Sequence, residues 1–173
     1  TFLYNNALTV DGGAINFHSK LLKTNFNNLT FLNNRARNGG GAINTDDNVN
    51  DNNSYVNSTF INNSAKNGGA FNGYGYSNYN SFETCVFINN SVTNHGGAIY
   101  YSRNIERNTL NNCVFVNNSA KANGGAIYSY RNSNYNKYNN TIVTTEITAA
   151  TIWFSVMDEI KNPMAISAAP IKK

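Results

Sequence analysis

The chain has 173 residues and a formal net charge of +4, and only 13% of its residues are charged. A modest positive charge without a clustered basic face excludes the electrostatic footprint of a nucleic-acid-binding protein. No apolar run approaches the roughly 20 residues that cross a bilayer as a helix, so we expect no membrane span in this segment.

Asparagine fills 37 positions, a composition that is typical of disordered chains. Against disorder stands an aromatic content of 13%, placed at regular intervals, which gives a folded structure apolar surface to bury. We therefore interpret the asparagines as residues of turns and of stacked side-chain ladders.

Two short signatures alternate along the chain and define a repeat. The first has the form F-x-x-N-x-A and lies at 2–7, 31–36, 60–65, 87–92 and 115–120, with Val at its end in the fourth copy. The second is Gly-Gly-Ala-Ile, or Gly-Gly-Ala-Phe in the third copy, and returns every 28 residues at 12–15, 40–43, 68–71, 96–99 and 124–127. A fixed period of this size indicates a stacked repeat architecture.

Each repeat holds three short apolar segments, too short for helices and separated by Asn, Ser and Gly. One contains the Phe of the first signature, one lies five residues before that Phe, and one follows the Gly pair. The runs at 85–88 and 113–116 are β-branched and aromatic, as strands are. The predicted fold class is all-β, a parallel β-helix (solenoid) of about five 28-residue coils over residues 1–146.

In such a fold, equivalent residues of successive coils stack about 4.8 Å apart. We therefore expect one inward aromatic column and one hydrogen-bonded amide ladder where the chain turns. The members of the column are Phe31, Phe60, Phe87 and Phe115, and those of the ladder are Asn34, Asn63, Asn90 and Asn118. The Gly pair and the residue before it, mostly of a type that tolerates positive φ, predict a sharp corner.

The repeat pattern stops after residue 146, and 147–173 form a separate segment. Apolar residues between Ile152 and Ile160 share one helical face, which predicts a short amphipathic helix ending before Pro163. Such a helix would cap the open end of the solenoid, and a loose tail is the alternative. Because Thr1 lies inside a repeat, we expect a longer parent protein that carries the export signal and the anchor.

The pairing of the two signatures resembles the repeats of the chlamydial polymorphic outer-membrane proteins and of the Asn-rich adhesin-like surface proteins of methanogenic archaea. The resemblance covers residues 1 to about 146 and implies a right-handed parallel β-helix of the pectin-lyase type. It also implies a non-enzymatic, extracellular adhesin or passenger segment that displays variable loops. Its expected partner is a glycan or protein on the surface of a host or partner cell.

The alternative function is a polysaccharide lyase or hydrolase, or a lectin-like module, on the same scaffold. Such enzymes need clustered carboxylates, as paired acid and base or as calcium ligands. Only Asp46, Asp47 and Asp51 cluster, in a loop that we interpret as solvated, with a weak calcium site as the alternative. His18 and His95 have no visible partner for metal or triad chemistry. We predict no catalytic residue, no metal and no cofactor.

The two cysteines, Cys85 and Cys113, lie one period apart in a slot that earlier repeats fill with Leu29 and Ser58. Two buried thiols are one interpretation. A disulfide is the other, although side chains stacked in register point the same way and would strain the bond.

Tyrosine gathers in the variable segment after the Gly signature. Aromatic faces with nearby Arg donors suit sugars or extended peptide segments. The alternative is that tyrosine merely rigidifies an exposed sheet and its loops. The residues predicted to bind are Tyr74, Tyr76, Tyr100, Tyr101, Arg103, Tyr128, Tyr130 and Arg131.

Overall fold

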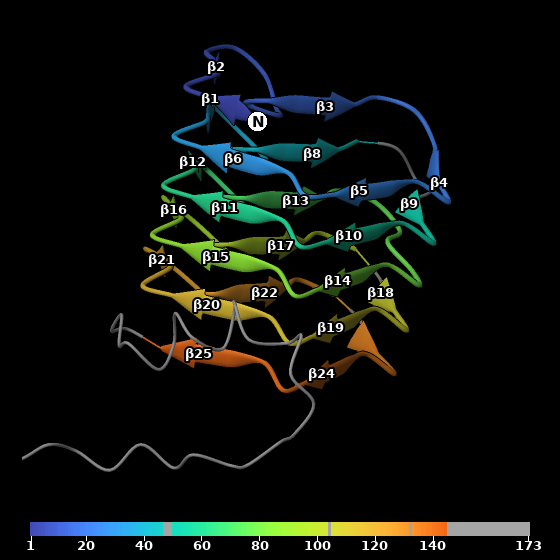
Figure 1. The fold of residues 1–173 in the computed structure, drawn as a ribbon. Helices are drawn as coiled ribbons and strands as arrows, with labels where there is room; N and C mark the ends of the chain where they lie inside the picture. The colour runs from blue at the N-terminus through green and yellow to red at the C-terminus, as the bar shows by residue number, and fades with distance from the viewer. Residues whose placement is uncertain (47–49, 104, 132, 145–173) are drawn as a thin grey trace, which may run out of the picture.

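The computed structural model describes residues 1–46, 50–103, 105–131 and 133–144. This part of the chain is a parallel β-solenoid of about 5 turns with coils of ~28 residues, and none of its described residues is helical. Figure 1 shows the coils stacked as a rod, with the N-terminal coil at one end and β25 (Ile142–Thr144) at the other. The predicted all-β solenoid is thus confirmed, whereas the helix predicted within 147–173 lies outside the described residues.

Every named strand pairs in parallel with the equivalent strand of at least one adjacent coil, so the sheets run along the rod. The Phe sheet consists of β1 (Phe2–Leu3), β6 (Thr30–Leu32), β11 (Thr59–Ile61), β15 (Val86–Ile88), β20 (Val114–Val116) and β25. The lobe sheet, which leads into the Gly pair, consists of β2 (Asn6–Ala7), β7 (Arg35–Ala36), β12 (Ser64–Ala65), β16 (Ser91–Val92) and β21 (Ser119–Ala120).

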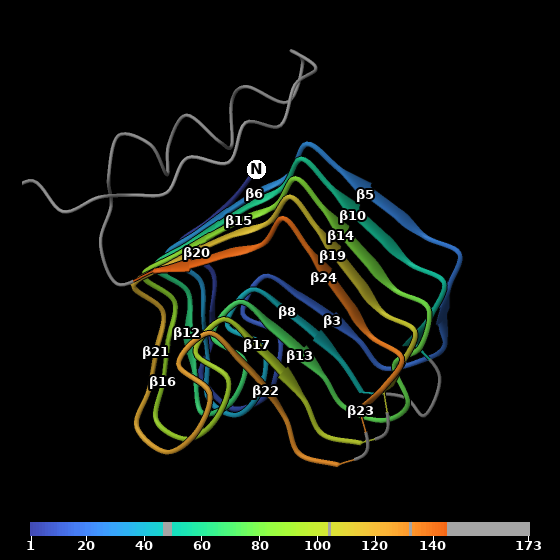
Figure 2. The same ribbon diagram turned by 90° about the horizontal axis from the view of Figure 1, so that it is seen from below.

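The remaining sheets complete each turn (Figure 2). The Gly sheet, which follows the Gly pair, consists of β3 (Ile15–Phe17), β8 (Ile43–Thr45), β13 (Phe71–Gly73), β17 (Ile99–Tyr101) and β22 (Ile127–Ser129). The flank sheet consists of β5 (Asn25–Asn27), β10 (Ser54–Val56), β14 (Ser81–Glu83), β19 (Thr109–Asn111) and β24 (Lys137–Asn139). Between these two lie the pairs β4 (Leu21–Leu22) with β9 (Asn50–Asp51) and β18 (Ile105–Glu106) with β23 (Ser133–Asn134).

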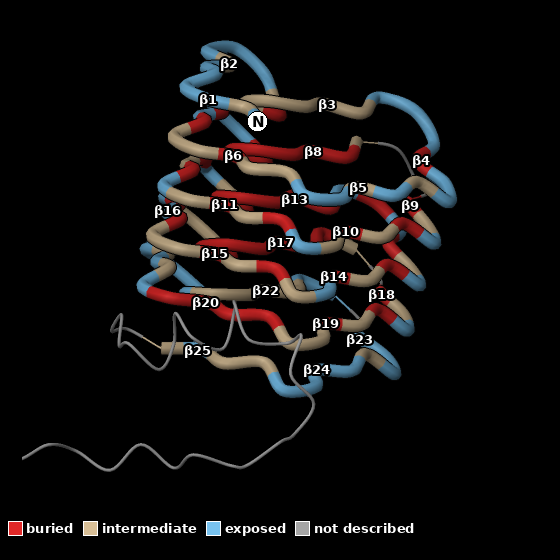
Figure 3. Tube along the Cα trace, viewed as in Figure 1, coloured by how far each residue is buried: buried red, intermediate tan, exposed pale blue. Residues whose placement is uncertain are grey.

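Stacked aromatic rings fill the core of the rod. The Phe of β6, β11, β15 and β20 points inward, and these four rings, which were predicted to stack, are fully buried with centroids 4.9, 4.8 and 4.5 Å apart along the column. A second column runs through the flank sheet, where Tyr55 stacks on Phe82 at 4.5 Å. Phe71 of the Gly sheet meets both of these rings edge-on at 5.5 and 5.4 Å. Figure 3 shows the resulting pattern, with burial concentrated in the middle coils and exposure at the two ends.

Asparagine has two structural roles, which explains its abundance. At the corners of each coil one residue takes a left-handed φ of about 45° to 57°, a conformation that asparagine adopts more readily than most residues. At the next position the side chain turns inward and joins a ladder. The pair Asn62-Asn63 shows both roles, because Asn62 has φ 54° and Asn63 is fully buried.

The predicted amide ladder is present and continuous. Asn63 donates from Nδ2 to the Asn90 side-chain oxygen at 3.0 Å and to the Phe31 carbonyl at 3.0 Å, and its backbone N–H donates to the same Asn90 oxygen. Asn90 repeats this arrangement with Asn118 and with the Phe60 carbonyl. Each buried amide is therefore satisfied only when the neighbouring coils are in place.

A second amide ladder, which sequence reasoning did not identify, supports the flank sheet. Its members are Asn53, Asn80, Asn108 and Asn136, and the backbone N–H of each of the first three donates to the next member's side-chain oxygen at 2.8 to 2.9 Å. The signal was present in the sequence, because each of these asparagines lies two residues before the large inward side chain of a flank-sheet strand. This pattern was overlooked because other asparagines stand close to the ladder positions in the sequence.

The two glycines of each pair are required for different reasons. The first takes a left-handed φ, as at Gly96 with 68°, whereas the preceding His95 does not. The second packs against the chain of the adjacent lobe-sheet strand. A Cβ on Gly97 would collide with the Gly125 carbonyl and lie 2.6 Å from the Ser119 nitrogen.

Candidate binding surface

Tyr100 and Tyr128 occupy the outward position at the centre of β17 and β22. They continue a column that earlier coils fill with Asn16, Asn44 and Asn72. The two Tyr rings lie 6.1 Å apart, and the His95 ring covers Tyr128 at 4.8 Å. Tyr100 is only 9% exposed, so this column presents mainly its last members to a ligand.

Tyr101 is buried, so the prediction that it belongs to the binding surface was wrong. Strand alternation turns Tyr101 inward, where it is 1% exposed and meets the Phe71 ring edge-on at 5.9 Å. Its neighbour in register one coil before is Gly73, and a Cβ there would approach the Tyr101 ring to 2.7 Å. The absent side chain of Gly73 therefore makes room for Tyr101 in the core.

The other predicted tyrosines lie where the Gly sheet ends. Tyr74, Tyr76 and Tyr130 are exposed, and two of them are paired with the predicted arginines. The Arg103 guanidinium lies 5.9 Å from the centre of the Tyr74 ring, and that of Arg131 lies 6.0 Å from the Tyr130 ring. These distances allow cation–π attraction, which holds the rings and the donors together at the surface.

A column that sequence reasoning missed stands beside them, at the corner before the flank sheet. The Arg107 guanidinium lies 5.5 Å from the Tyr79 ring and 5.4 Å from the Tyr135 ring, one coil to either side, and Arg107 donates to the Tyr79 hydroxyl at 2.8 Å. The three residues have φ of 55° or 56°. Their spacing of 28 residues is the signal that could have revealed the column.

Burial and neighbouring tyrosines also shift the pKa of Tyr100. Partial burial raises the pKa of Tyr100 above its ordinary value, and Tyr128, Tyr130 and Tyr74 raise it further, since neighbouring phenolates would repel each other. The Tyr100 phenol therefore stays a neutral donor and acceptor at physiological pH. We call the set Tyr74, Tyr76, Tyr79, Arg103, Arg107, Tyr130, Arg131 and Tyr135 the Tyr–Arg face.

The acidic loop and the histidines offer less chemistry. His18 does have a partner, contrary to expectation, because its Nδ1 lies 2.9 Å from an Asp46 oxygen, and its Nε2 lies 2.9 Å from the Asn16 amide. Asp51 accepts the Asn78 backbone N–H at 2.9 Å. Within residues 1–46, 50–103, 105–131 and 133–144, no three His, Cys, Asp or Glu side chains gather as metal ligands would.

Cys85 and Cys113 are free, buried thiols in adjacent coils. Each thiol donates to a backbone carbonyl of the flank sheet, Cys85 to Tyr55 at 3.3 Å and Cys113 to Phe82 at 3.4 Å. A hydrogen bond between the two thiols raises the pKa of Cys113 and lowers that of Cys85. Both side chains are fully buried, so reagents in solution do not reach them.

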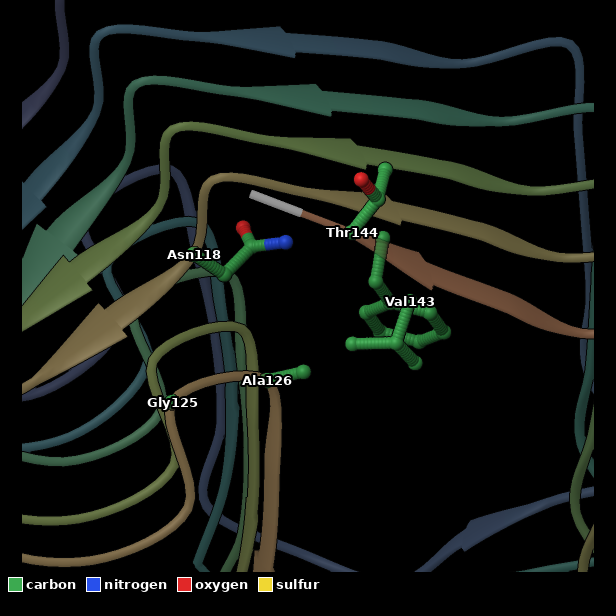
Figure 4. Close-up of a pocket in the computed structure, with 6 residues that line it drawn as sticks. Asn118, Gly125, Ala126, Val143 and Thr144 are labelled. Carbon is green, nitrogen blue, oxygen red and sulfur yellow. The ribbon is translucent and has the colours of Figure 1, made fainter. Parts of the chain in front are cut away.

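A hollow of about 520 Å³ lies at the end of the aromatic column, where Val143 replaces Phe. Figure 4 shows Val143 of β25 pointing into the hollow, beside the end of the amide ladder at Asn118 and across from Ala126 and Gly125, while the Thr144 side chain points to the other side of the strand. Because Phe115 and Asn118 belong to its described lining, this hollow continues the aromatic column and the amide ladder.

Comparison with known proteins identifies the repeat. Residues 28–46, 84–102 and 112–130 match the family model of the Chlamydia polymorphic membrane protein repeat. Each match covers the inward Phe, the ladder Asn and the Gly pair of one repeat. No curated protein and no solved structure matches the chain. The described part of the chain contains no helix that could span a bilayer.

Proposed function

We propose, from the polymorphic-membrane-protein type of its repeats, that the chain is a non-enzymatic passenger scaffold at the cell surface. The rod acts as an adhesin segment, and the Tyr–Arg face is its binding surface. The ligand class is a glycan or an extended peptide segment on a host or partner cell.

The observation that carries this proposal is the column of Tyr79, Arg107 and Tyr135. A guanidinium held between two aromatic rings loses little conformational freedom when it binds, because it is already oriented. Tyr79 is 48% and Tyr135 75% exposed, so ring faces and hydroxyls remain accessible. Sugars bind such surfaces through C–H contacts with the ring and hydrogen bonds to the phenol and guanidinium.

The position on the rod supports the same function. The Tyr–Arg face spans the third to fifth coils, and each coil contributes at most a few exposed groups. Weak contacts repeated at a fixed spacing give useful affinity only when several act together. A rigid solenoid supplies that spacing without an entropic cost of ordering, whereas separate loops would have to be ordered on binding.

The test uses variants that the scaffold already accepts. Asn52 holds the same corner as the column in an earlier coil, with φ 57°, so Tyr79→Asn, Arg107→Asn and Tyr135→Asn together should leave the backbone unchanged. Beads coated with this variant should lose attachment to a printed array of neutral cell-surface glycans. The matched control is Tyr4→Asn with Thr84→Asn, at left-handed corners outside the Tyr–Arg face.

Far-ultraviolet circular dichroism must show the same β spectrum for all three proteins. Unchanged attachment of the column variant would show that the tyrosines are only scaffold. Release of reducing or unsaturated ends from a panel of acidic and neutral polysaccharides would instead favour the enzyme.

A further inference from the structure

The lobe sheet carries a second surface, which the Tyr–Arg face does not include. A groove of about 490 Å³ runs along the rod over all five coils. One three-residue segment of each coil lines it, at 6–8, 35–37, 64–66, 91–93 and 119–121. Figure 2 shows β12, β16 and β21 on the side of the cross-section away from β23, so the groove and the corner that holds Tyr79 face different directions.

Register sorts the lining into three rows. The middle row is small, with Ala7, Ala36, Ala65, Val92 and Ala120. One outer row holds Arg35 and three serines, and the other holds Arg37, Lys66, Thr93 and Lys121 after Leu8. The middle row is largely buried, as at Ala36 and Val92. Because side chains alternate along a strand, the long or hydroxylated side chains of the two outer rows project to the opposite, solvent side, where a ligand can reach them.

The charge of the groove is entirely positive. Arg35, Arg37, Lys66 and Lys121 line it, and no Asp or Glu does. In the part of the chain that the structure describes, ion pairs join only His18 to Asp46 and Arg107 to Glu106, so carboxylates of the protein leave these four cations unmatched. The hydroxyls of Ser64, Ser91 and Ser119 make no hydrogen bond within the described residues either, so they are available to a ligand.

We propose that this groove binds an acidic polysaccharide, a chain of uronic or sulfated sugars laid along the rod axis. Coils follow one another about every 4.8 Å, a length similar to the advance of one sugar in an extended chain, so each sugar would face one coil. Arg35 and Arg37 match carboxylate and sulfate oxygens with their planar forks, and the hydroxyls match the sugar hydroxyls.

Two other polyanions fit less well. No aromatic side chain lines the groove, so the bases of a single-stranded nucleic acid would have nothing on which to stack. An anionic membrane is flat and would reach the long Arg and Lys side chains, but not the shorter serine hydroxyls between them.

The experiment measures binding of the full chain to immobilised heparin, with neutral dextran and oligo-dT as comparison ligands. The test variant combines Arg37→Thr, Lys66→Thr and Lys121→Thr, because Thr93 already stands in this row. The control combines Lys20→Ser, Lys23→Asn and Lys137→Thr. It also removes three positive charges, and Asn52 and Thr109 hold the same register as Lys23 and Lys137.

We expect the chain to bind heparin with a Kd that rises with salt, and not to bind dextran. The groove variant should weaken heparin binding by about tenfold or more, since it removes three exposed charge contacts, and the control by less than about twofold. The variant in the Tyr79 column should keep heparin binding. Equal losses in the groove variant and the control, binding of dextran, or tighter binding of oligo-dT than of heparin would each overturn the proposal.

Discussion

The rings of Phe87 and Phe115 stack with their centroids 4.5 Å apart and their planes 3° apart, and Phe60 covers the other face of Phe87 at 4.8 Å. Phe87→Ala removes one ring from this column and leaves a cavity in its place. We expect it to lower the free energy of unfolding by about 3 to 5 kcal/mol, since the rings above and below cannot close the gap. Chemical denaturation measures the loss.

Ile88 is the control for this substitution because it is the next residue of the same strand and is only half-buried on the outer face. Ile88→Ala should cost about 1 kcal/mol. Equal losses at the two positions would contradict the assignment of the strand faces.

The amide ladder makes Asn90 more important to stability than Asn94. Asn90→Ala removes the acceptor of both the Asn63 backbone N–H and its side-chain amide, and takes one donor away from the Phe60 carbonyl. Each buried group left unmatched costs roughly 1 to 3 kcal/mol. Asn94 is half-buried and lies outside the ladder. Thermal unfolding of the two Ala variants should rank them in this order, and the reverse order would place the ladder outside the core.

Gly97 and Gly125 hold the same position in successive coils but have different surroundings. A Cβ on Gly97 meets backbone of the next coil, whereas the nearest described atom to a Cβ on Gly125 is the Asn118 carbonyl oxygen at 3.2 Å. Gly97→Ala should therefore destabilise the rod by about 1 to 3 kcal/mol or more, and Gly125→Ala should be nearly neutral. Denaturant titration of both variants is the measurement. Similar losses would show that backbone conformation, rather than coil contact, selects the second glycine.

Burial of Tyr55 and Tyr101 makes stability depend on alkaline pH. Burial raises the pKa of both phenols above the ordinary value of 10.0. The unfolded chain therefore releases these protons first as the pH rises. The free energy of unfolding should fall above pH 10 by up to about 1.4 kcal/mol per pH unit for each tyrosine.

Tyr55→Phe should reduce this slope, and Phe fits because Phe82 holds the same place one coil on. The Tyr55 hydroxyl has no hydrogen-bond partner within the described chain, so the variant should be at least as stable as the original protein at pH 7. Urea unfolding between pH 7 and 11 tests both statements. A loss of stability at pH 7 would mean that the hydroxyl is satisfied in solution.

The core could be predicted from the sequence because its packing and hydrogen-bonding positions recur at a fixed interval. A Phe that must stack on itself and an Asn that must bond to itself return at a fixed interval, and the interval alone places them in columns. The second ladder was harder, because Asn53 and its equivalents stand among other asparagines that serve the corners. Composition does not distinguish the two roles, but distance from the inward aromatic residue does.

The candidate surface was only partly predictable for a different reason. Tyr100 and Tyr101 are adjacent in the sequence, and nothing in their types shows which one the strand turns inward. Arg107 was overlooked because a single arginine carries no periodic signal until it is read together with Tyr79 and Tyr135. Side-chain direction within a strand of three residues depends on register, and register was fixed only when the coils were assembled.

The fixed step of the Gly pairs has a genetic consequence. Because each described coil pairs with its neighbours through the same columns and corners, unequal crossing-over between two copies of the coding repeat removes or adds whole coils without disturbing the register of the others. Surface corners such as that of Asn52 and Tyr79 accept amide or phenol on one backbone. Such a gene can change the reach of its product and the chemistry of its surface by separate mutational events, one acting on copy number and the other on single codons.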